Sequence, residues 1–161
     1  RLTSDGERKW QKLQAIVYGQ RIRKAQLMDG VREFLKFCTK HEIKVYIISH
    51  KTRYSNLGES KDDLQVAALD FMRQNGFFDE NLLNLSVDSV YFESTREEKV
   101  SRIKTLHCTH FIDDLEEVFL EKSFPKTVEK FLYDPHQWYT PSSELRIVKH
   151  WGEIYEYFFK T

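Results

Sequence analysis

The chain has 161 residues, of which 40% are apolar and 31% are charged, an ordinary composition for one soluble domain with its own core. Its 25 basic and 25 acidic residues cancel, which excludes the basic surface typical of nucleic-acid-binding and membrane-surface proteins. No apolar run approaches membrane-spanning length. We therefore expect neither a nucleic-acid nor a membrane partner, and a phosphorylated ligand would have to be held by a local site.

The two cysteines, Cys38 and Cys108, each lie in or beside an apolar segment, and their spacing matches no metal-binding pattern. Buried free thiols in a reducing compartment are the expected state, which favours a cytoplasmic protein. The chain begins at Arg1, so a targeting segment could have been removed.

The first half of the chain predicts helices around one buried strand. Residues 1–24 predict a helix with a basic cluster at its end, so that residues 1–26 would form a small cap or linker outside a core at 27–161. The β-branched run at 45–48 predicts a strand that stops at Ser49 and His50. Two amphipathic helices are predicted around this strand, one after Asp29-Gly30 and one at residues 61–74.

The second half predicts three strands that each end in a carboxylate. Residues 90–92 end at Glu93, residues 111–112 end at Asp113-Asp114, and residues 131–133 end at Asp134. A helix with an apolar stripe at 100–106 precedes the second of these strands. Residues 144–161 hold a short apolar piece at 147–148 and a closing helix.

Alternating strands and helices imply right-handed parallel crossovers, so we predict an α/β fold: a Rossmann-like three-layer sandwich with a mainly parallel sheet. In such a sheet Ser49, Glu93, Asp113 and Asp134 all lie at the carboxyl ends of the strands, where open α/β sheets bind their ligands. His136 follows Asp134-Pro135 and could line the mouth of such a site.

Asp113 and Asp114 are two adjacent carboxylates at one strand end, and they repel each other unless a cation or hydrogen-bond donors compensate. Mg²⁺ is the natural compensating ion. The alternative is a solvated turn in which an aspartate caps the helix predicted near Leu115. The motif alone leaves both interpretations open.

A combination of motifs resembles the haloacid dehalogenase (HAD) superfamily. Ile47-Ile48-Ser49, Lys99 and Phe111-Ile112-Asp113-Asp114 match three of its four motifs in order and spacing, over about residues 27–158. The segments Ile-Ser-His-Lys-Thr and Thr-His-Phe-Ile-Asp-Asp also resemble the corresponding segments of a bacterial branch of HAD-like proteins.

The resemblance implies a Mg²⁺-dependent phosphatase that acts on a small phosphorylated metabolite through an aspartyl-phosphate. It implies that the Ser49 hydroxyl and the backbone amide of His50 bind the phosphoryl group, and that Lys99 balances charge there. Asp113 and Asp114 would be the metal ligand and its neighbour. It further implies at most a minimal helical cap. For Lys99 the alternative is a surface lysine without a role.

One motif of the superfamily is not found: the Asp-x-Asp that ends the first, central strand and supplies the nucleophile. Asp5-Gly6 echoes its tail, but Thr3 stands where the first aspartate belongs; Asp62-Asp63 is better explained as helix-start acids. Without that strand its two neighbours would lie about 10 Å apart with unpaired inner edges. We therefore expect the strand and the nucleophile to lie upstream of Arg1; the alternative is a non-catalytic homologue.

Two other functions compete with the hydrolase. One is a non-catalytic module that keeps the fold and binds a phosphorylated ligand. The other is a receiver-like signalling domain, which also has an acidic pair and a lysine but in the reverse chain order. The residues encoded upstream of Arg1 would discriminate between them, because an apolar strand ending in Asp-x-Asp indicates an enzyme.

Overall fold

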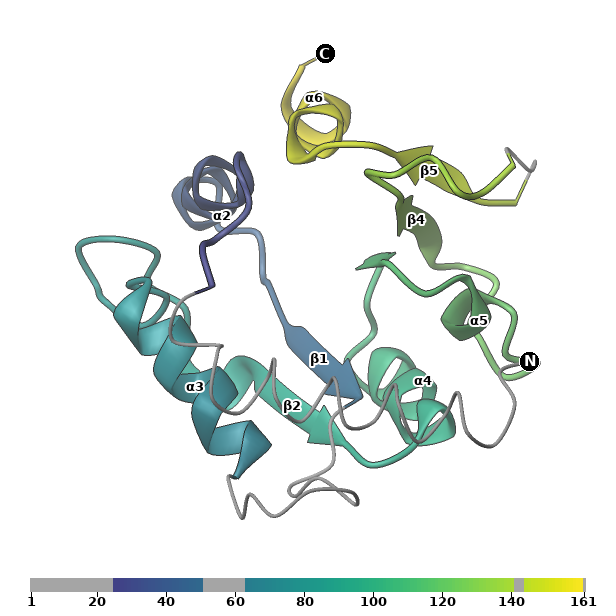
Figure 1. The fold of residues 1–161 in the computed structure, drawn as a ribbon, viewed down its shortest axis with the longest axis horizontal. Helices are drawn as coiled ribbons and strands as arrows, with labels where there is room; N and C mark the ends of the chain where they lie inside the picture. The colour runs from purple at the N-terminus through teal and green to yellow at the C-terminus, as the bar shows by residue number, and fades with distance from the viewer. Residues whose placement is uncertain (1–24, 51–62, 141–143, 161) are drawn as a thin grey trace.

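The computed structural model describes residues 25–50, 63–140 and 144–160, so the helix predicted at 1–24 and the positions Asp5 and Asp62 lie outside the described residues. Helices and strands alternate along these ranges (Figure 1). None of the helices found there is both long and apolar enough to cross a membrane. The elements are α2 Val31–Lys40, β1 Ile47–His50, α3 Leu64–Gln74, the 3-10 helix Val87–Ser89, β2 Val90–Glu93, α4 Arg96–Thr105, β3 His110–Asp113, α5 Glu116–Phe119, β4 Glu129–Tyr133, β5 Arg146–Val148 and α6 Trp151–Phe159.

The strands form two parallel sheets, one of β1 and β2 and one with the order β3-β4-β5. The predicted α/β class with parallel pairing is therefore confirmed, and the short apolar piece at 147–148 is a strand. β1 begins two residues later than predicted, because its partner β2 starts at Val90, which pairs with Ile47. As a result Ser49 and His50 belong to the strand, where the prediction had placed them just after it.

Two apolar clusters form the core, and each takes side chains from both sheets. Ile47 packs against the cluster of α2 and α6, whereas Ile48 belongs to the cluster of α4 and α5. Successive residues of a strand point to opposite faces, so this alternation identifies the two faces of β1. The same division recurs in the other sheet for Ile112 and Phe111, Phe131 and Leu132, and Val148 and Ile147.

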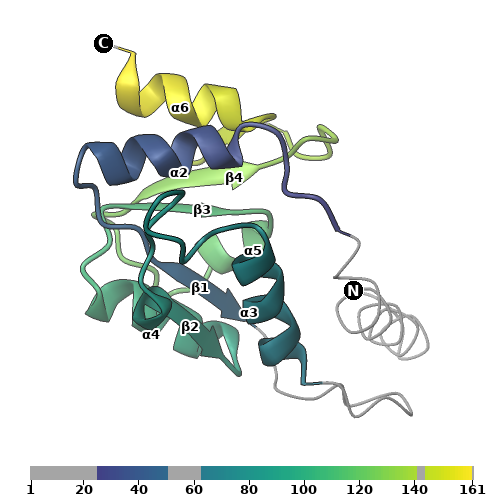
Figure 2. The same cartoon turned by 90° about the vertical axis from the view of Figure 1, so that its left-hand side faces the viewer.

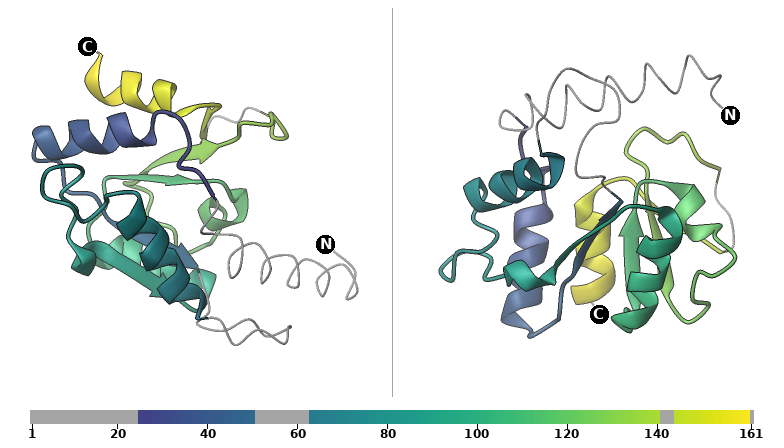
Figure 3. Two further views of the ribbon diagram at one scale, coloured as in Figure 1. Left: turned by 60° about the vertical axis from the view of Figure 1, so that its left-hand side comes forward. Right: turned by 90° about the horizontal axis from the view of Figure 1, so that it is seen from below.

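The helices are distributed accordingly. α2 and α6 pack together along one side of the strands, and α4 lies on the other side (Figure 2). Since both sheets contribute to the same two clusters, the sheets share their helical cover on each side. The right-hand view of Figure 3 shows the strands of both sheets running alongside one another.

No backbone ladder joins β1 to β3 within the described residues. β1 has β2 on one side, and β3 has β4 on one side, so each keeps one edge without a partner strand there. Direct pairing of β1 with β3 would have contradicted the prediction that a strand belongs between them, and it is not observed.

Candidate functional site at the carboxyl ends of the strands

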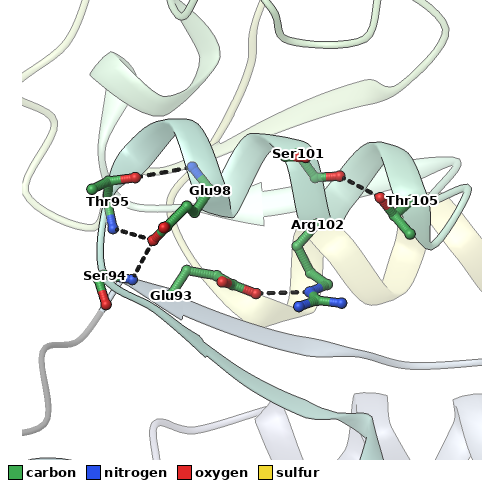
Figure 4. A network of polar contacts seen from close by, with 7 residues as sticks. All are labelled: Glu93, Ser94, Thr95, Glu98, Ser101, Arg102 and Thr105. Atoms are coloured by element: carbon green, nitrogen blue, oxygen red, sulfur yellow. Dashed lines mark hydrogen bonds and ion pairs between the residues drawn. The ribbon is translucent and has the colours of Figure 1, made fainter.

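The turn from β2 into α4 fixes the first turn of that helix. The Thr95 hydroxyl accepts from the backbone amide of Glu98, and the Glu98 carboxylate accepts from the amides of Ser94 and Thr95 (Figure 4). This reciprocal capping satisfies amides that the helix itself leaves free. The capping therefore fixes the backbone of the first turn, from which the side chain of the next residue, Lys99, projects.

Lys99 is a buried cation. Only 6% of the residue is exposed, and its ammonium group forms an ion pair with the Asp113 carboxylate at the end of β3. The ammonium nitrogen also lies 5.5 Å from the centre of the Phe111 ring. The alternative of a surface lysine is therefore wrong. Because Lys99 follows β2 and Asp113 ends β3, this contact also shows that both sheets point their carboxyl ends toward the same side.

Asp113 uses both carboxylate oxygens. One takes part in the ion pair with Lys99, and Oδ1 accepts a hydrogen bond from the Leu115 amide at 3.0 Å. Leu115 is itself the N-cap residue of α5, without a side-chain cap. Neither aspartate therefore caps α5 from the N-cap position, although Asp113 does stabilise the turn before the helix. The N-cap interpretation of the acidic pair is therefore wrong in detail, and the Mg²⁺ interpretation stays a prediction.

Asp114, the second carboxylate at the end of β3, forms no ion pair among the described residues. Its side chain reaches solvent, in contrast to the buried Asp113. Partial burial and, after it, the neighbouring Asp113 carboxylate raise the pKa of Asp114 above its ordinary value. The charge of Lys99 opposes this rise but does not cancel it. The end of β3 therefore still disfavours its second negative charge.

Ser49 and His50 occupy the end of β1, in the other sheet. The Ser49 hydroxyl has no hydrogen-bond partner among the described residues. The His50 side chain, in contrast, contacts the Ser94 carbonyl oxygen through Nε2 at 3.0 Å and so joins β1 to the turn before α4. The predicted ligand role for His50 thus depends on its backbone amide, because its ring is engaged in holding two strand ends together.

The two remaining carboxylates at strand ends have structural partners. Glu93 forms an ion pair with Arg102 of α4 at 2.7 Å, and the Arg102 guanidinium stacks over Tyr91 of the same strand (Figure 4 shows the ion pair). Asp134 is 2% exposed and accepts the backbone amides of Trp138 and Tyr139, at 3.0 and 2.9 Å. The structure therefore brings together Lys99, Asp113 and Asp114, and assigns Glu93 and Asp134 to holding the surrounding chain.

Asp134 provides a pH-dependent test of this assignment. Burial alone would raise its pKa, but the hydrogen bonds from the Tyr139 and Trp138 amides outweigh burial and hold the pKa below the ordinary 3.8. Between the folded pKa and 3.8 the unfolded chain binds more protons, so stability rises with pH across that window. We expect Asp134→Asn to lower the free energy of unfolding at pH 7 and to differ less from wild type as the pH falls through the folded pKa.

Urea denaturation from pH 7 down to pH 3 measures this effect. The matched control is Glu80→Gln, an exposed acid whose removal should leave wild-type behaviour at every pH. A constant difference between Asp134→Asn and wild type over the whole pH range would show that the carboxylate charge is not what holds the loop.

Mg²⁺ was predicted at Asp113 and Asp114, and the side chains around them are the possible ligands. Among the described residues no three His, Cys, Asp or Glu side chains gather into a metal-binding group. Mg²⁺ needs fewer, since it is usually bound by one or two carboxylates and completes its octahedron with water and phosphate oxygens. Adjacent carboxylates at the end of β3, one of them with a raised pKa, fit that ion by charge and by ligand type.

Sequence reasoning did not predict the direct contact between Lys99 and Asp113, nor the burial of the lysine. A lysine in the first turn of a helix, where its charge opposes the helix dipole, was the available signal. Comparison of the chain with protein-family models, with curated proteins and with solved structures found no match.

Proposed function

We propose that the chain is the core of a HAD-like hydrolase, a Mg²⁺-dependent phosphatase that acts on a small phosphorylated metabolite. One observation supports this proposal above all: a buried lysine paired with a buried aspartate at a strand end, beside a second carboxylate that forms no ion pair among the described residues. This is the charge distribution that a phosphoryl group and a divalent cation require.

Stability alone does not account for the buried pair. Replacing a buried ion pair with apolar side chains of similar volume is often neutral or stabilising, because desolvation cancels much of the attraction. The Lys99 ammonium lies over the ring of Phe111, which with Val100 belongs to the apolar cluster of α4 and α5, so apolar side chains would suit this position as well. A catalytic or binding requirement for the two charges explains their presence.

Each residue then has a stated task. Lys99 balances the negative charge of the phosphoryl group, as a compact point charge with three donors. The Ser49 hydroxyl, which has no partner among the described residues, and the His50 backbone amide would donate to phosphoryl oxygens. Asp113 and Asp114 would hold Mg²⁺, which when bound neutralises charge on the phosphoryl oxygens. Bound Mg²⁺ would add a second positive charge beside Asp114, whose raised pKa Lys99 alone does not bring back to its ordinary value.

The nucleophile belongs to a strand outside the described residues. We place this strand between β1 and β3, in a three-layer α/β sandwich whose helices cover both faces. The edges of β1 and β3 that have no partner strand among the described residues, and the two clusters that their side chains share, support that position. The end of the inserted strand would lie between Ser49 and Asp113, so an aspartate there would reach a phosphoryl group held by Ser49 and Lys99.

Magnesium binding tests the metal assignment. In the full-length protein we expect saturating Mg²⁺ to stabilise wild type by about 2 to 3 kcal/mol at a hundred times the dissociation constant. Asp113→Asn should lose most of that response, because it removes a carboxylate ligand. Thermal-shift titration measures the stabilisation of each protein by Mg²⁺, and calorimetry measures its dissociation constant.

Glu93→Gln is the matched control, since it removes a strand-end carboxylate that is already paired with Arg102. It should respond to Mg²⁺ as wild type does. An equal response of Asp113→Asn and wild type would overturn the metal assignment.

Turnover separates the enzyme from the binding module. A panel of phosphate monoesters is incubated with the full-length protein and Mg²⁺, and phosphate release is measured. Release that depends on Lys99 supports the hydrolase. Binding of phosphate esters without release from any of them would favour the non-catalytic module.

A further inference from the structure

The loop after β4 carries an unusually exposed aromatic side chain. Trp138 is 79% exposed, although burying a large aromatic surface is strongly favourable. Its ring stacks on that of His136, with ring centroids 4.7 Å apart and planes inclined by 24°. A solvent-exposed indole that stacks on a second ring presents a flat surface suited to stacking of planar groups.

This loop is held in place by its backbone. The Asp134 carboxylate accepts the amides of Trp138 and Tyr139, and the Asp134 amide donates to Val148 of β5 at 2.8 Å. Pro135 further restricts the chain between them. The exposed indole is thus attached to a restrained backbone, which reduces the entropy lost when a ligand stacks on it.

The loop also lies beside the candidate site. Leu132 of β4 pairs with Asp113 of β3, so Asp134 is two residues beyond that level on the adjacent strand. Because the Trp138 amide bonds to Asp134, we estimate that this amide lies on the order of 10 Å from Asp113. Burial and, after it, the carboxylates of Glu117 and Glu116 in α5, the helix that follows the acidic pair, raise the pKa of Tyr139.

We infer that Trp138, stacked on His136, binds a planar ring of the substrate whose phosphoryl group occupies the site at Lys99 and Asp113. The substrate class is then a phosphate monoester that carries an aromatic or heteroaromatic ring. This inference rests on the proposed function, because the phosphoryl site positions the ring. The sequence had suggested only that His136 lines the mouth of the site. Trp138 and His136 together now have a role in binding the substrate ring.

Two non-hydrolysable probes test the inference in the full-length protein with Mg²⁺. Benzylphosphonate carries a planar ring, and cyclohexylmethylphosphonate carries a saturated ring of the same size. Stacking of a ring on an aromatic side chain is worth enough to change affinity about tenfold or more. We expect wild type to bind benzylphosphonate about tenfold more tightly, Trp138→Leu to lose that preference, and Trp138→Phe to keep part of it.

Leu120→Ala is the control, since Leu120 is another exposed apolar residue, 65% accessible, next to α5. It should retain the wild-type preference. Equal affinity of wild type for the two probes overturns the inference and leaves the phosphoryl site intact, whereas failure to bind either probe contradicts the proposed function itself. A change of oligomeric state in Trp138→Leu with an unchanged ring preference would assign the indole to a protein contact and also overturn the inference.

Discussion

Lys99→Ala should lower turnover of a generic aryl phosphate by two to three orders of magnitude in the full-length protein. The ammonium group is 6% exposed and paired with Asp113, so it acts where water cannot replace it. Loss of such a charge from a site that binds a transferring phosphoryl group costs several kcal/mol of transition-state stabilisation, or about a hundredfold to a thousandfold in rate. Steady-state kinetics with saturating Mg²⁺ measure the loss.

The same substitution should also weaken the fold, because it leaves Asp113 buried without its partner. Removing one member of a buried ion pair costs about 3 to 5 kcal/mol. Mg²⁺ should restore part of this stability, since it neutralises the same carboxylate, but it should not restore the rate. Assays are therefore run below the melting temperature of the variant, with circular dichroism as the check on folding.

Two further variants separate the effects of charge and folding. Lys99→Met combined with Asp113→Asn removes both charges, so it should recover stability while remaining inactive. Lys104→Ala removes an exposed lysine from the same helix and should match wild type in rate and stability. Turnover by Lys99→Ala comparable to wild type would refute the role of Lys99.

The local elements were predictable because their signals are local. The amphipathic helix predicted after Asp29-Gly30 is α2, and its buried face consists of Val31, Phe34, Leu35 and Cys38. Short β-branched and aromatic runs did become the parallel strands. The bounds of β1 were not predictable, because the ladder is set by Val90 on another strand, more than forty residues away.

In the candidate site, too, features set by neighbouring residues were predictable, and contacts between distant elements were not. Positions at strand ends followed from the alternation of elements, so Asp113, Asp114 and Ser49 could be named. Side-chain contacts between different helices and strands could not be predicted. Nothing local indicates that Lys99 reaches Asp113, or that Arg102 pairs with Glu93 and stacks over Tyr91. Such contacts depend on how α4 packs against both sheets.

Hydrogen exchange at the unpaired edges should give the second large effect. In a parallel ladder alternate residues of a strand bond a given neighbour, so β1 and β3 each direct part of their amides toward the space between them. In the 161-residue chain we expect these amides to exchange quickly and their ladder-bonded neighbours slowly. With the proposed strand in place, consecutive amides of β1 and β3 should all be protected, and the edge amides should slow by about a thousandfold or more.

The strand β4 serves as the internal standard, because it pairs with β3 on one side and β5 on the other. Its amides should be protected in both chain lengths. Residue-resolved exchange on a protein that includes the residues encoded upstream of Arg1 makes the comparison. Unpaired backbone groups between two apolar clusters are costly, so a strand that satisfies them should also raise the free energy of unfolding. If β1 and β3 keep the alternating pattern in the longer protein, no strand lies between them, and the nucleophile cannot reach the phosphoryl site in the way proposed.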